Sequence, residues 1–249
     1  ARTALFNWLF AKSNDGLFLL RIEDTDKTRS ERKYVENIID SMEWLGINPD
    51  KEVIYQSDRE DRYKEIIDKL LKKNAAYYCN CTKKELDSLR KEQQEKGIKP
   101  KYDGRNRDKN LNNEPGSVVR FKTPLVGKIC IKDTLKGEVT VNNEELDDLI
   151  IQRADGSPTY NLTVVVDDVD MKVTNVIRGD DHLNNTFRQA HIIDALGVKR
   201  PIYTHIPLIL GEDRKRLSKR HGATSTYDFR KEGFLPLSMI NYLARLGWA

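Results

Sequence analysis

Cysteine and histidine are scarce in this sequence, and no long apolar run is present. Three cysteines among 249 residues cannot build the disulfide framework of a small secreted domain. No segment has the pattern of a signal peptide, and none is apolar over the length of a membrane span. We therefore expect a cytoplasmic protein with no membrane partner.

The scarcity of histidine limits the catalytic chemistry that the sequence predicts. The four histidines are His182, His191, His205 and His221, and no pattern around them pairs a base with a nucleophile. General acid–base catalysis is therefore not required. This suits a reaction in which a carboxylate of the substrate is itself the nucleophile.

Metal-ligand patterns are equally sparse. Cys79 and Cys81 could supply half of a structural zinc site, but such a site normally takes four ligands, and no second Cys or His pair stands nearby. We expect no zinc and no other metal held by the protein.

Charge of one sign is not in excess. The 43 Lys and Arg residues against 39 Asp and Glu give a net charge of +4, which does not indicate non-specific binding to polyanions. Positive charge is instead local, because residues 83–109 are dense in Lys and Arg and poor in large apolar residues. This stretch is the best candidate for a nucleic-acid-binding face.

The length of 249 residues fits one large domain or two of ordinary size, and apolar periodicity predicts a globular α/β fold. Leu5, Trp8 and Leu9 already have helical spacing at the N-terminus. Further amphipathic helices are expected at 31–45, 58–73, 83–95, 185–196 and 234–246. Short apolar or β-branched runs predict strands at 17–22, 75–79, 117–122, 128–133, 137–141, 149–153, 162–168 and 173–179.

The composition changes at about residue 82. A charged helix and several short strands follow, which indicates an insertion with its own antiparallel sheet. Apolar strands return at Leu149. The interpretation is a doubly wound α/β domain interrupted by an insertion, with a helical segment that starts after a basic loop at residues 215–220.

Acidic residues directly follow the first predicted strand. In an open parallel sheet the carboxyl ends of strands line the ligand crevice, so Glu23, Asp24 and Asp26 are placed to meet an ammonium group or a ribose. A surface turn, in which Asp24 or Asp26 caps the next helix, is the alternative.

A second polar cluster follows a later strand. Arg178 there could hold a carboxylate by two parallel hydrogen bonds, Gly179 could let the backbone approach a ligand, and an adjacent acid could bind ribose hydroxyls. An ordinary turn with an exposed ion pair is the alternative. Tyr160 has an apolar ring and a polar tip, which suits a pocket wall, but a core tyrosine has the same features.

A basic loop lies near the C-terminal end. It runs from Lys215 to Arg220 and contains Leu217 and Ser218. Adenylyl and phosphoryl chemistry depends on positioning and charge neutralisation, so a cationic loop late in an α/β domain could grip a departing pyrophosphate. A solvated surface or a generic nucleic-acid patch would have the same composition.

Several motifs carry a family resemblance when they are taken in order. They are Arg2–Asn7, Arg21–Asp26, Tyr55–Ser57, Tyr102–Gly104, Asp155–Leu162, Val166–Asp168 and Arg216–Arg220. Together they closely resemble bacterial glutamyl-tRNA synthetases, which are class I aminoacyl-tRNA synthetases. The resemblance covers essentially the whole chain, and Arg21–Asp26 favours the glutamyl over the glutaminyl branch.

The resemblance implies a Rossmann-type doubly wound parallel sheet split by an α+β insertion that binds the tRNA acceptor end. The first half of the catalytic domain is expected at 1–81, the insertion at 82–148 and the second half at 149–210. The basic phosphate loop and the start of a helical stem-contact segment are expected at 211–249.

The resemblance also implies a glutamate–tRNA ligase. ATP with Mg²⁺ and L-glutamate would form glutamyl-adenylate, and the glutamyl group would pass to the 3′-terminal adenosine of tRNA(Glu). Glu23, Tyr160 and Arg178 match the glutamate pocket, with Arg178 facing the side-chain carboxylate. Asp181 and His182 match contacts to the adenosine part of ATP. A monomer is expected.

Arg216 and Lys219 match the catalytic loop that neutralises the phosphates, with Lys219 also binding ATP. The first of these positions is Arg216 rather than Lys, which keeps the charge but alters the geometry. The ATP motif of the His-x-Gly-His type would precede Ala1, and the anticodon-binding part would follow Ala249. The chain is therefore expected to be a fragment that is inactive by itself, and its sequence leaves open whether tRNA(Gln) is also charged.

Two other functions are compatible with parts of this pattern. A shortened paralogue of the family glutamylates a modified base in tRNA and also lacks the anticodon-binding domain. The segment 234–248 and the untrimmed insertion favour the synthetase. A non-catalytic tRNA-binding module would keep the fold, but Glu23, Tyr160, Arg178 and Lys219 argue against it.

Overall fold

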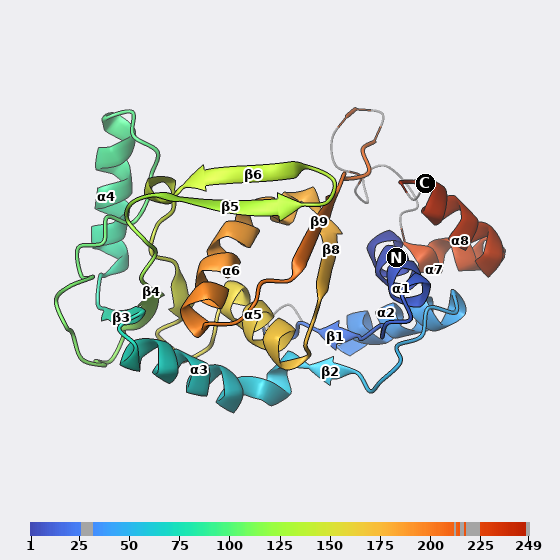
Figure 1. Ribbon diagram of the computed structural model, residues 1–249, viewed down its shortest axis with the longest axis horizontal. Helices are drawn as coiled ribbons and strands as arrows, with labels where there is room; N and C mark the ends of the chain where they lie inside the picture. Colours follow the sequence, from blue (N-terminus) through green and yellow to red (C-terminus); the bar gives the residue numbers. More distant parts are fainter. Residues whose placement is uncertain (26–31, 212, 215–216, 218–224, 248–249) are drawn as a thin grey trace. The chain divides into compact units, whose positions relative to one another are not determined.

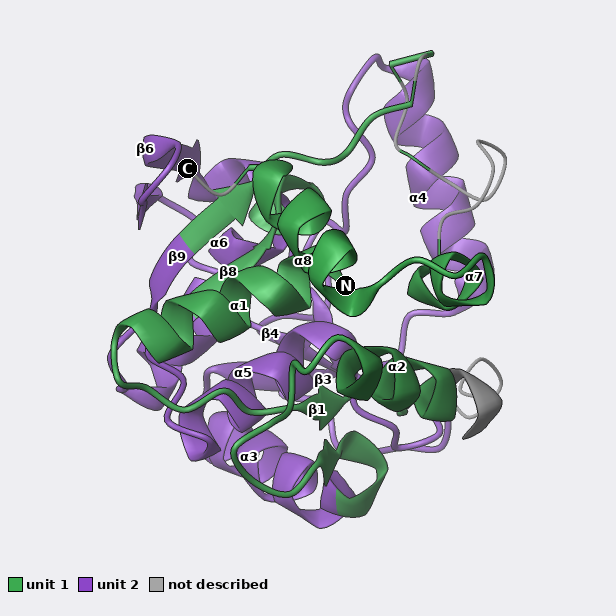
Figure 2. Ribbon diagram, turned by 90° about the vertical axis from the view of Figure 1, so that its right-hand side faces the viewer, with its two compact units in different colours: residues 1–58, 176–183, 204–249 green, residues 59–175, 184–203 purple. Residues whose placement is uncertain are grey.

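The computed structural model describes residues 1–25, 32–211, 213–214, 217 and 225–247, and Figure 1 labels most of its helices and strands. The chain divides into two units, which Figure 2 colours separately. Unit 1 comprises residues 1–58, 176–183 and 204–249, and unit 2 comprises residues 59–175 and 184–203. Each unit therefore combines segments that are far apart in the sequence.

Unit 1 takes its elements from both ends of the chain and from the short segment 176–183. They are α1 (Arg2–Ser13), β1 (Arg21–Ile22), α2 (Arg32–Trp44), β2 (Ile54–Tyr55), the 3₁₀ helices η1 (Gln56–Arg59, ending at the division) and η3 (Asp180–His182), α7 (Thr226–Lys231) and α8 (Pro236–Arg245). The apolar sides of α1, α2 and α8 form its main core with the segments around them. The buried side chains of this core are Leu5, Phe18, Met42, Leu45, Ile47, Met239 and Leu243.

The first predicted strand is shorter than the sequence indicates. Within 17–22, the strand β1 contains Arg21 and Ile22, which pair in parallel with Ile54 and Tyr55 of β2. Upstream, the amide of Phe18 donates to the carboxylate of Asp50 at 2.7 Å, and its carbonyl accepts from the Asp50 amide at 2.8 Å. A side-chain oxygen thus takes the place of a ladder partner, so the regular pairing begins later.

Unit 2 contains most of the middle of the chain. Its elements are α3 (Glu60–Lys72), β3 (Ala76–Cys79), α4 (Lys83–Glu95), β4 (Val118–Phe121), β5 (Lys128–Asp133), β6 (Gly137–Asn142), η2 (Asn143–Glu145), β7 (Ile150–Gln152), α5 (Tyr160–Asp170) and α6 (Leu183–Leu196). The strands β8 (Asn175–Gly179) and β9 (Ile202–Ile206) run across the division between the units.

The strands of segment 82–148 do not form a separate sheet in the described part of the chain, so that prediction is wrong. The strand β4 pairs antiparallel with β3 and β7, whereas β5 pairs antiparallel with β6 and in parallel with β9 at Asp133 and Tyr203. A short hairpin is marginally stable alone, and both sheets gain a hydrophobic face by including strands from outside the segment. The limits of the insertion, 82–148, stay a prediction.

The segment 162–168 is part of helix α5 and not the predicted strand. Its β-branched run, Thr163–Val166, favours a strand by propensity alone. All residues from Leu162 to Asp167 are buried, however, and a run that is apolar all round looks the same in a buried helix as in a buried strand. Tertiary packing therefore overrides the local preference here.

The core of unit 2 lies between its helices and the β3–β4–β7 sheet. It includes Tyr63, Ile66, Ile67 and Leu70 of α3, Leu162, Val165 and Val166 of α5, and Ile192, Ile193 and Leu196 of α6, packed on Ala76, Val119, Phe121, Leu149 and Ile151. None of the helices in the described part of the chain is long and apolar enough to cross a membrane.

Candidate active site

Arg178 lies near the end of β8, and its side chain is fixed by a histidine of β9. The Nε of Arg178 donates a hydrogen bond to Nε2 of His205 at 3.2 Å. Arg178 is partly buried, whereas His205 is completely buried, with 0% relative exposure. Both residues belong to unit 1. The arrangement holds a guanidinium at a strand end, where the sequence predicts recognition of a carboxylate.

Asp181 and His182 lie on the 3₁₀ helix η3, which directly follows β8. His182 Nε2 and Asp181 Oδ2 are 4.0 Å apart. A Cβ added to Gly179 would overlap Oδ1 of Asp181 and lie 3.3 Å from Cδ2 of Leu208. The space that the sequence interpretation assigned to a ligand beside Gly179 is therefore used by the Asp181 carboxylate. Arg178, Asp181 and His182 thus share one strand end, as their closeness in sequence predicts.

The backbone of β8 is anchored next to Arg178. Asn7 of α1 donates from Nδ2 to the carbonyl of Ile177 at 2.9 Å and to its own helix at Thr3 O, at 2.8 Å. Ile177 is buried with Phe6 and Ile206 in a small apolar cluster. This cluster and the Asn7 hydrogen bond place the strand that carries Arg178 against α1.

Glu23 is exposed directly after β1. Its Oε1 is 3.4 Å from Nη2 of Arg21, and 41% of its side chain is exposed. An exposed ion pair of this length stabilises the fold little, so the Glu23 carboxylate remains accessible to a cationic ligand.

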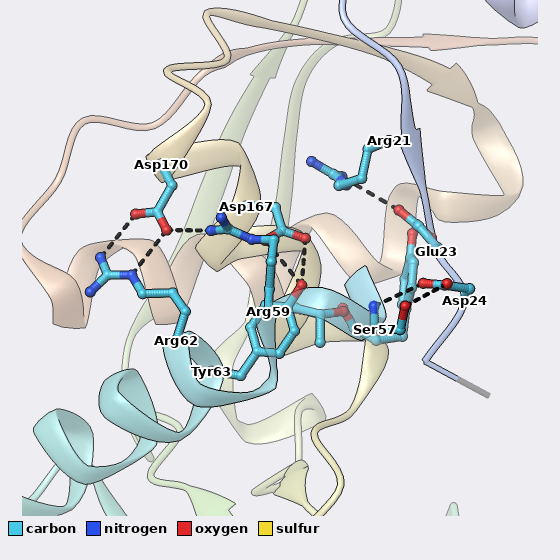
Figure 3. Close-up of polar contacts among 11 residues, drawn as sticks. Arg21, Glu23, Asp24, Ser57, Arg59, Arg62, Tyr63, Asp167 and Asp170 are labelled. Atoms are coloured by element: carbon cyan, nitrogen blue, oxygen red, sulfur yellow. Dashed lines mark hydrogen bonds and ion pairs between the residues drawn. The ribbon is translucent and has the colours of Figure 1, made fainter. Parts of the chain in front are cut away.

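Asp24 has a structural role (Figure 3). Its Oδ1 accepts from the Ser57 amide at 2.9 Å, and its Oδ2 accepts from the Ser57 hydroxyl at 2.7 Å. The carboxylate thereby connects the end of β1 to η1, within the predicted motif Tyr55–Ser57. Asp26, the third acid of the predicted motif Arg21–Asp26, lies outside the described residues.

Tyr160 is the first residue of α5 and is half-buried. The preceding residue, Thr159, bonds to β7 through its hydroxyl, which donates to Ile150 O at 2.7 Å, and through its amide, which donates to Ile151 O at 3.0 Å. Gln189 Nε2 donates to Oδ1 of the following Asn161 at 3.3 Å. The start of α5 is therefore fixed on both sides of Tyr160.

The remainder of α5 is clamped to the start of α3 by ion pairs (Figure 3). Asp167 is completely buried and accepts from Arg59 Nε at 2.7 Å and from the Tyr63 hydroxyl at 2.9 Å. Asp170 accepts two hydrogen bonds from Arg62, both at 2.9 Å. Burial and the neighbouring Asp167 carboxylate raise the pKa of Tyr63 well above its usual range, so its hydroxyl remains a donor.

The two cysteines of β3 and its following loop lie beside a phenol. Cys79 Sγ is 3.4 Å and Cys81 Sγ 3.9 Å from the Tyr102 hydroxyl, and Asn106 Nδ2 donates to Cys79 Sγ at 3.7 Å. A neutral phenol and an amide are poor zinc ligands. In the described part of the chain, no three His, Cys, Asp or Glu side chains are grouped to hold a metal ion. The predicted absence of zinc stays a prediction.

The structure describes the basic segment 83–109, whereas most of the basic loop 215–220 lies outside the described residues. Arg216 and Lys219, the predicted phosphate contacts, lie outside the described residues. In the predicted nucleic-acid-binding face, α4 has a shallow groove lined by Lys83, Lys84, Asp87, Ser88 and Lys91. This basic groove lies on the surface of unit 2.

Comparison with known proteins places the chain in a family. The model of the family described as tRNA synthetases class I (E and Q), catalytic domain, matches residues 1–249. The chain belongs to this family of class I aminoacyl-tRNA synthetase catalytic domains.

Two similar relatives are described as glutamate–tRNA ligases. The chain is 54% identical to glutamate–tRNA ligase of Lawsonia intracellularis and 55% identical to glutamate–tRNA ligase 1 of Nitrosococcus oceani. Both matches cover 100% of this chain but 54% and 53% of the respective relative. The chain thus spans about half the length of the curated relatives that it matches.

Solved structures agree on the fold. The glutamate–tRNA ligase of Elizabethkingia meningosepticum, crystallised in complex with its amino acid, superposes with a TM-score of 0.89 at 36% identity. The match covers 99% of this chain and 57% of that one. The synthetase of Elizabethkingia anophelis gives the same TM-score and identity. The mixed α/β architecture is therefore that of a class I synthetase catalytic domain, as the sequence predicts.

Three residues that hold elements carrying predicted site residues were not singled out by sequence reasoning: His205 and Asn7 in unit 1, and Arg59 in unit 2. His205 was assigned no role, although a histidine among the apolar residues of a strand needs a hydrogen-bond partner. Asn7 lay inside a motif without a separate role, and Arg59 precedes an amphipathic helix like many surface arginines. Each acts through a partner that is distant in the sequence, so no local pattern reveals it.

Proposed function

We propose that the native-length protein is a glutamate–tRNA ligase. The observation that carries this proposal is the match over the whole chain, at 54% and 55% identity, to relatives of that name. The ordered Arg178 at a strand end and the accessible Glu23 carboxylate support it, because an amino acid with two carboxylates and an ammonium group needs groups of both charges.

In the proposed reaction, a carboxylate oxygen of glutamate attacks the α-phosphorus of ATP. The bond to the β-phosphate breaks, so glutamyl-adenylate forms and pyrophosphate leaves. A ribose hydroxyl of the terminal adenosine of tRNA(Glu) then attacks the glutamyl carbonyl, and AMP departs. Binding and orientation dominate such chemistry, since the attacking carboxylate needs no activation by a base.

We assign the site residues to these substrates as follows. Arg178 would bind the side-chain carboxylate of glutamate, Glu23 its ammonium group, and Tyr160 would form a pocket wall. Asp181 and His182 would contact the adenosine. Arg216 and Lys219 would neutralise the phosphates. Mg²⁺ would accompany ATP, bound to its phosphates, and would withdraw negative charge from them.

The remaining expectations concern partners and location. Residues 82–148 would bind the acceptor end of tRNA, and 211–249 would include the phosphate loop and the start of the stem-contact segment. A cytoplasmic monomer without bound zinc stays a prediction, which light scattering and metal analysis of the purified protein can test.

ATP–pyrophosphate exchange on the native-length protein tests the proposed function. It should be measured with glutamate or glutamine, each with and without tRNA. Exchange that needs glutamate and is stimulated by tRNA is the expected result. Glutamate activation without tRNA would instead favour the base-modifying paralogue, and no exchange in any condition would favour a non-catalytic tRNA-binding module.

A further inference from the structure

His205 and Arg178 face each other on neighbouring strands. The sheet order is β6-β5-β9-β8, so β9 with His205 adjoins β8 with Arg178. Successive side chains of a strand point to opposite faces. Ile177 and Ile206, next to Arg178 and His205, share the buried cluster with Phe6, which leaves Arg178 and His205 on the other face of these strands.

The hydrogen bond between them defines the state of the histidine. An arginine guanidinium is always protonated and offers donors only. His205 Nε2 accepts a hydrogen bond from Arg178 Nε. This nitrogen therefore carries no proton, and the imidazole ring is neutral. The imidazole is therefore an acceptor placed against a cation, in a completely buried position.

This contact orients the guanidinium. Because Nε–H is directed to His205, a carboxylate that binds Arg178 through two parallel hydrogen bonds would use the edge formed by Nη1 and Nη2. A long side chain held in one geometry before binding loses less freedom when the ligand arrives. Asn7 fixes the backbone at Ile177 in addition, so both the main chain and the side chain of Arg178 are held.

We propose that His205 is a positioning residue that holds Arg178 in the orientation required to bind a carboxylate of the amino-acid substrate. This inference rests on the proposed function for the identity of the substrate, glutamate. It adds a residue with no direct contact to glutamate, and it sets which edge of the guanidinium is used.

Two substitutions separate positioning from simple packing. His205→Leu removes the acceptor, whereas His205→Gln offers an amide oxygen to Arg178 Nε. In glutamate-dependent exchange on the native-length protein, His205→Leu should raise KM for glutamate about tenfold or more, because a hydrogen bond to a charged group is removed. The KM for ATP and kcat should stay within about threefold of wild type. His205→Gln should recover most of the glutamate affinity.

His191→Leu is the matched control. His191 is also buried, but it bonds to Asn143 Oδ1 at 3.0 Å and not to Arg178. The His191→Leu variant should keep the wild-type KM for glutamate even if its stability is lower. The inference is overturned if His205→Leu keeps the wild-type KM for glutamate, if Gln restores nothing relative to Leu, or if kcat and both KM values deteriorate together.

A spectroscopic measurement on the wild type covers the case in which a variant fails to fold. An N–H···N hydrogen bond gives a ¹⁵N–¹⁵N coupling between Arg178 Nε and His205 Nε2, and no substrate is needed to observe it. A protonated His205 Nε2 without this coupling would overturn the inference. If the coupling is present but the wild type does not activate glutamate, the proposed function is wrong and the positioning of Arg178 by His205 stands.

Discussion

Arg59 donates through Nε to a carboxylate oxygen of Asp167 at 2.7 Å, and the Asp167 side chain is completely shielded from solvent. The second carboxylate oxygen accepts from the Tyr63 hydroxyl at 2.9 Å. A buried carboxylate is costly unless it is paired and hydrogen-bonded, and here both oxygens have partners on one turn of α3 and the residue before it. The arrangement joins α3 to α5, the helix that begins with Tyr160.

Replacing Asp167 by Ala should destabilise unit 2 strongly. Arg59 and Tyr63 would lose their shared acceptor inside the fold, and breaking one side of a buried ion pair costs about 3–5 kcal/mol. Urea unfolding of the variant and of the wild type gives the difference directly. Glu65→Ala is the control, since Glu65 forms an i,i+3 pair with Arg62 and 67% of its side chain is exposed. If both substitutions lower the free energy of unfolding by equally small amounts, the ion pair between Arg59 and Asp167 does not hold α3 to α5.

Gly179→Ala should impair binding of ATP more than binding of glutamate. The added methyl group would overlap Asp181 Oδ1, which must then move away from the end of β8. If Asp181 contacts the adenosine part of ATP, KM for ATP should rise about tenfold while KM for glutamate changes little.

Asp181→Asn keeps the volume at this position but removes the negative charge, so it serves as the companion variant. It should raise KM for ATP in the same direction. Steady-state exchange kinetics with each substrate varied in turn measure both effects. If both variants keep the wild-type KM for ATP, the assignment of Asp181 to the nucleotide site is wrong.

The basic groove of α4 should contribute to tRNA affinity by neutralising phosphates. The double change Lys84→Ala and Lys91→Ala removes two exposed lysines that line this groove. Binding should weaken, and the slope of log K against log salt should become shallower by about one for each phosphate that is no longer neutralised. Fluorescence anisotropy with labelled tRNA at several salt concentrations measures both quantities.

Lys64→Ala with Lys69→Ala is the matched control for charge, because these lysines are also exposed but lie on α3. The control should keep the wild-type salt slope. If both double variants lose affinity equally, total charge rather than the α4 groove determines tRNA binding.

Local sequence patterns predicted the elements whose signals are local. Helix α4 occupies the predicted range 83–95. The helical spacing of its polar and apolar residues is reinforced by a capping box between Thr82 and Glu85. Strand β5 likewise occupies 128–133, where burial alternates along the strand. The helix α5 was mistaken for a strand because uniform burial removes the periodic signal on which the distinction depends.

The site was predictable to the extent that its residues are neighbours in the sequence. Arg178, Asp181 and His182 lie together at the end of β8 because one strand and one turn carry them all. The hydrogen bond between Arg178 and His205 was not predictable, since the two residues are 27 positions apart and meet through strand pairing. The roles of all the predicted site residues toward substrates stay predictions, those of Arg178, Asp181 and His182 included.

Stability should fall in mild acid because of His191. Burial is the main cause that lowers the pKa of His191 below its usual range, with Arg200 acting in the same direction and Asp194 opposing it. The unfolded chain then binds a proton that the folded chain does not, so the free energy of unfolding decreases as the pH falls below about 6.5, the unperturbed pKa of histidine.

His191→Gln keeps an amide that can donate to Asn143 and does not titrate. Urea unfolding between about pH 7.5 and pH 5.5 should therefore show a smaller loss for the variant than for the wild type. Parallel stability curves for the two proteins would show that His191 does not titrate on unfolding in this range.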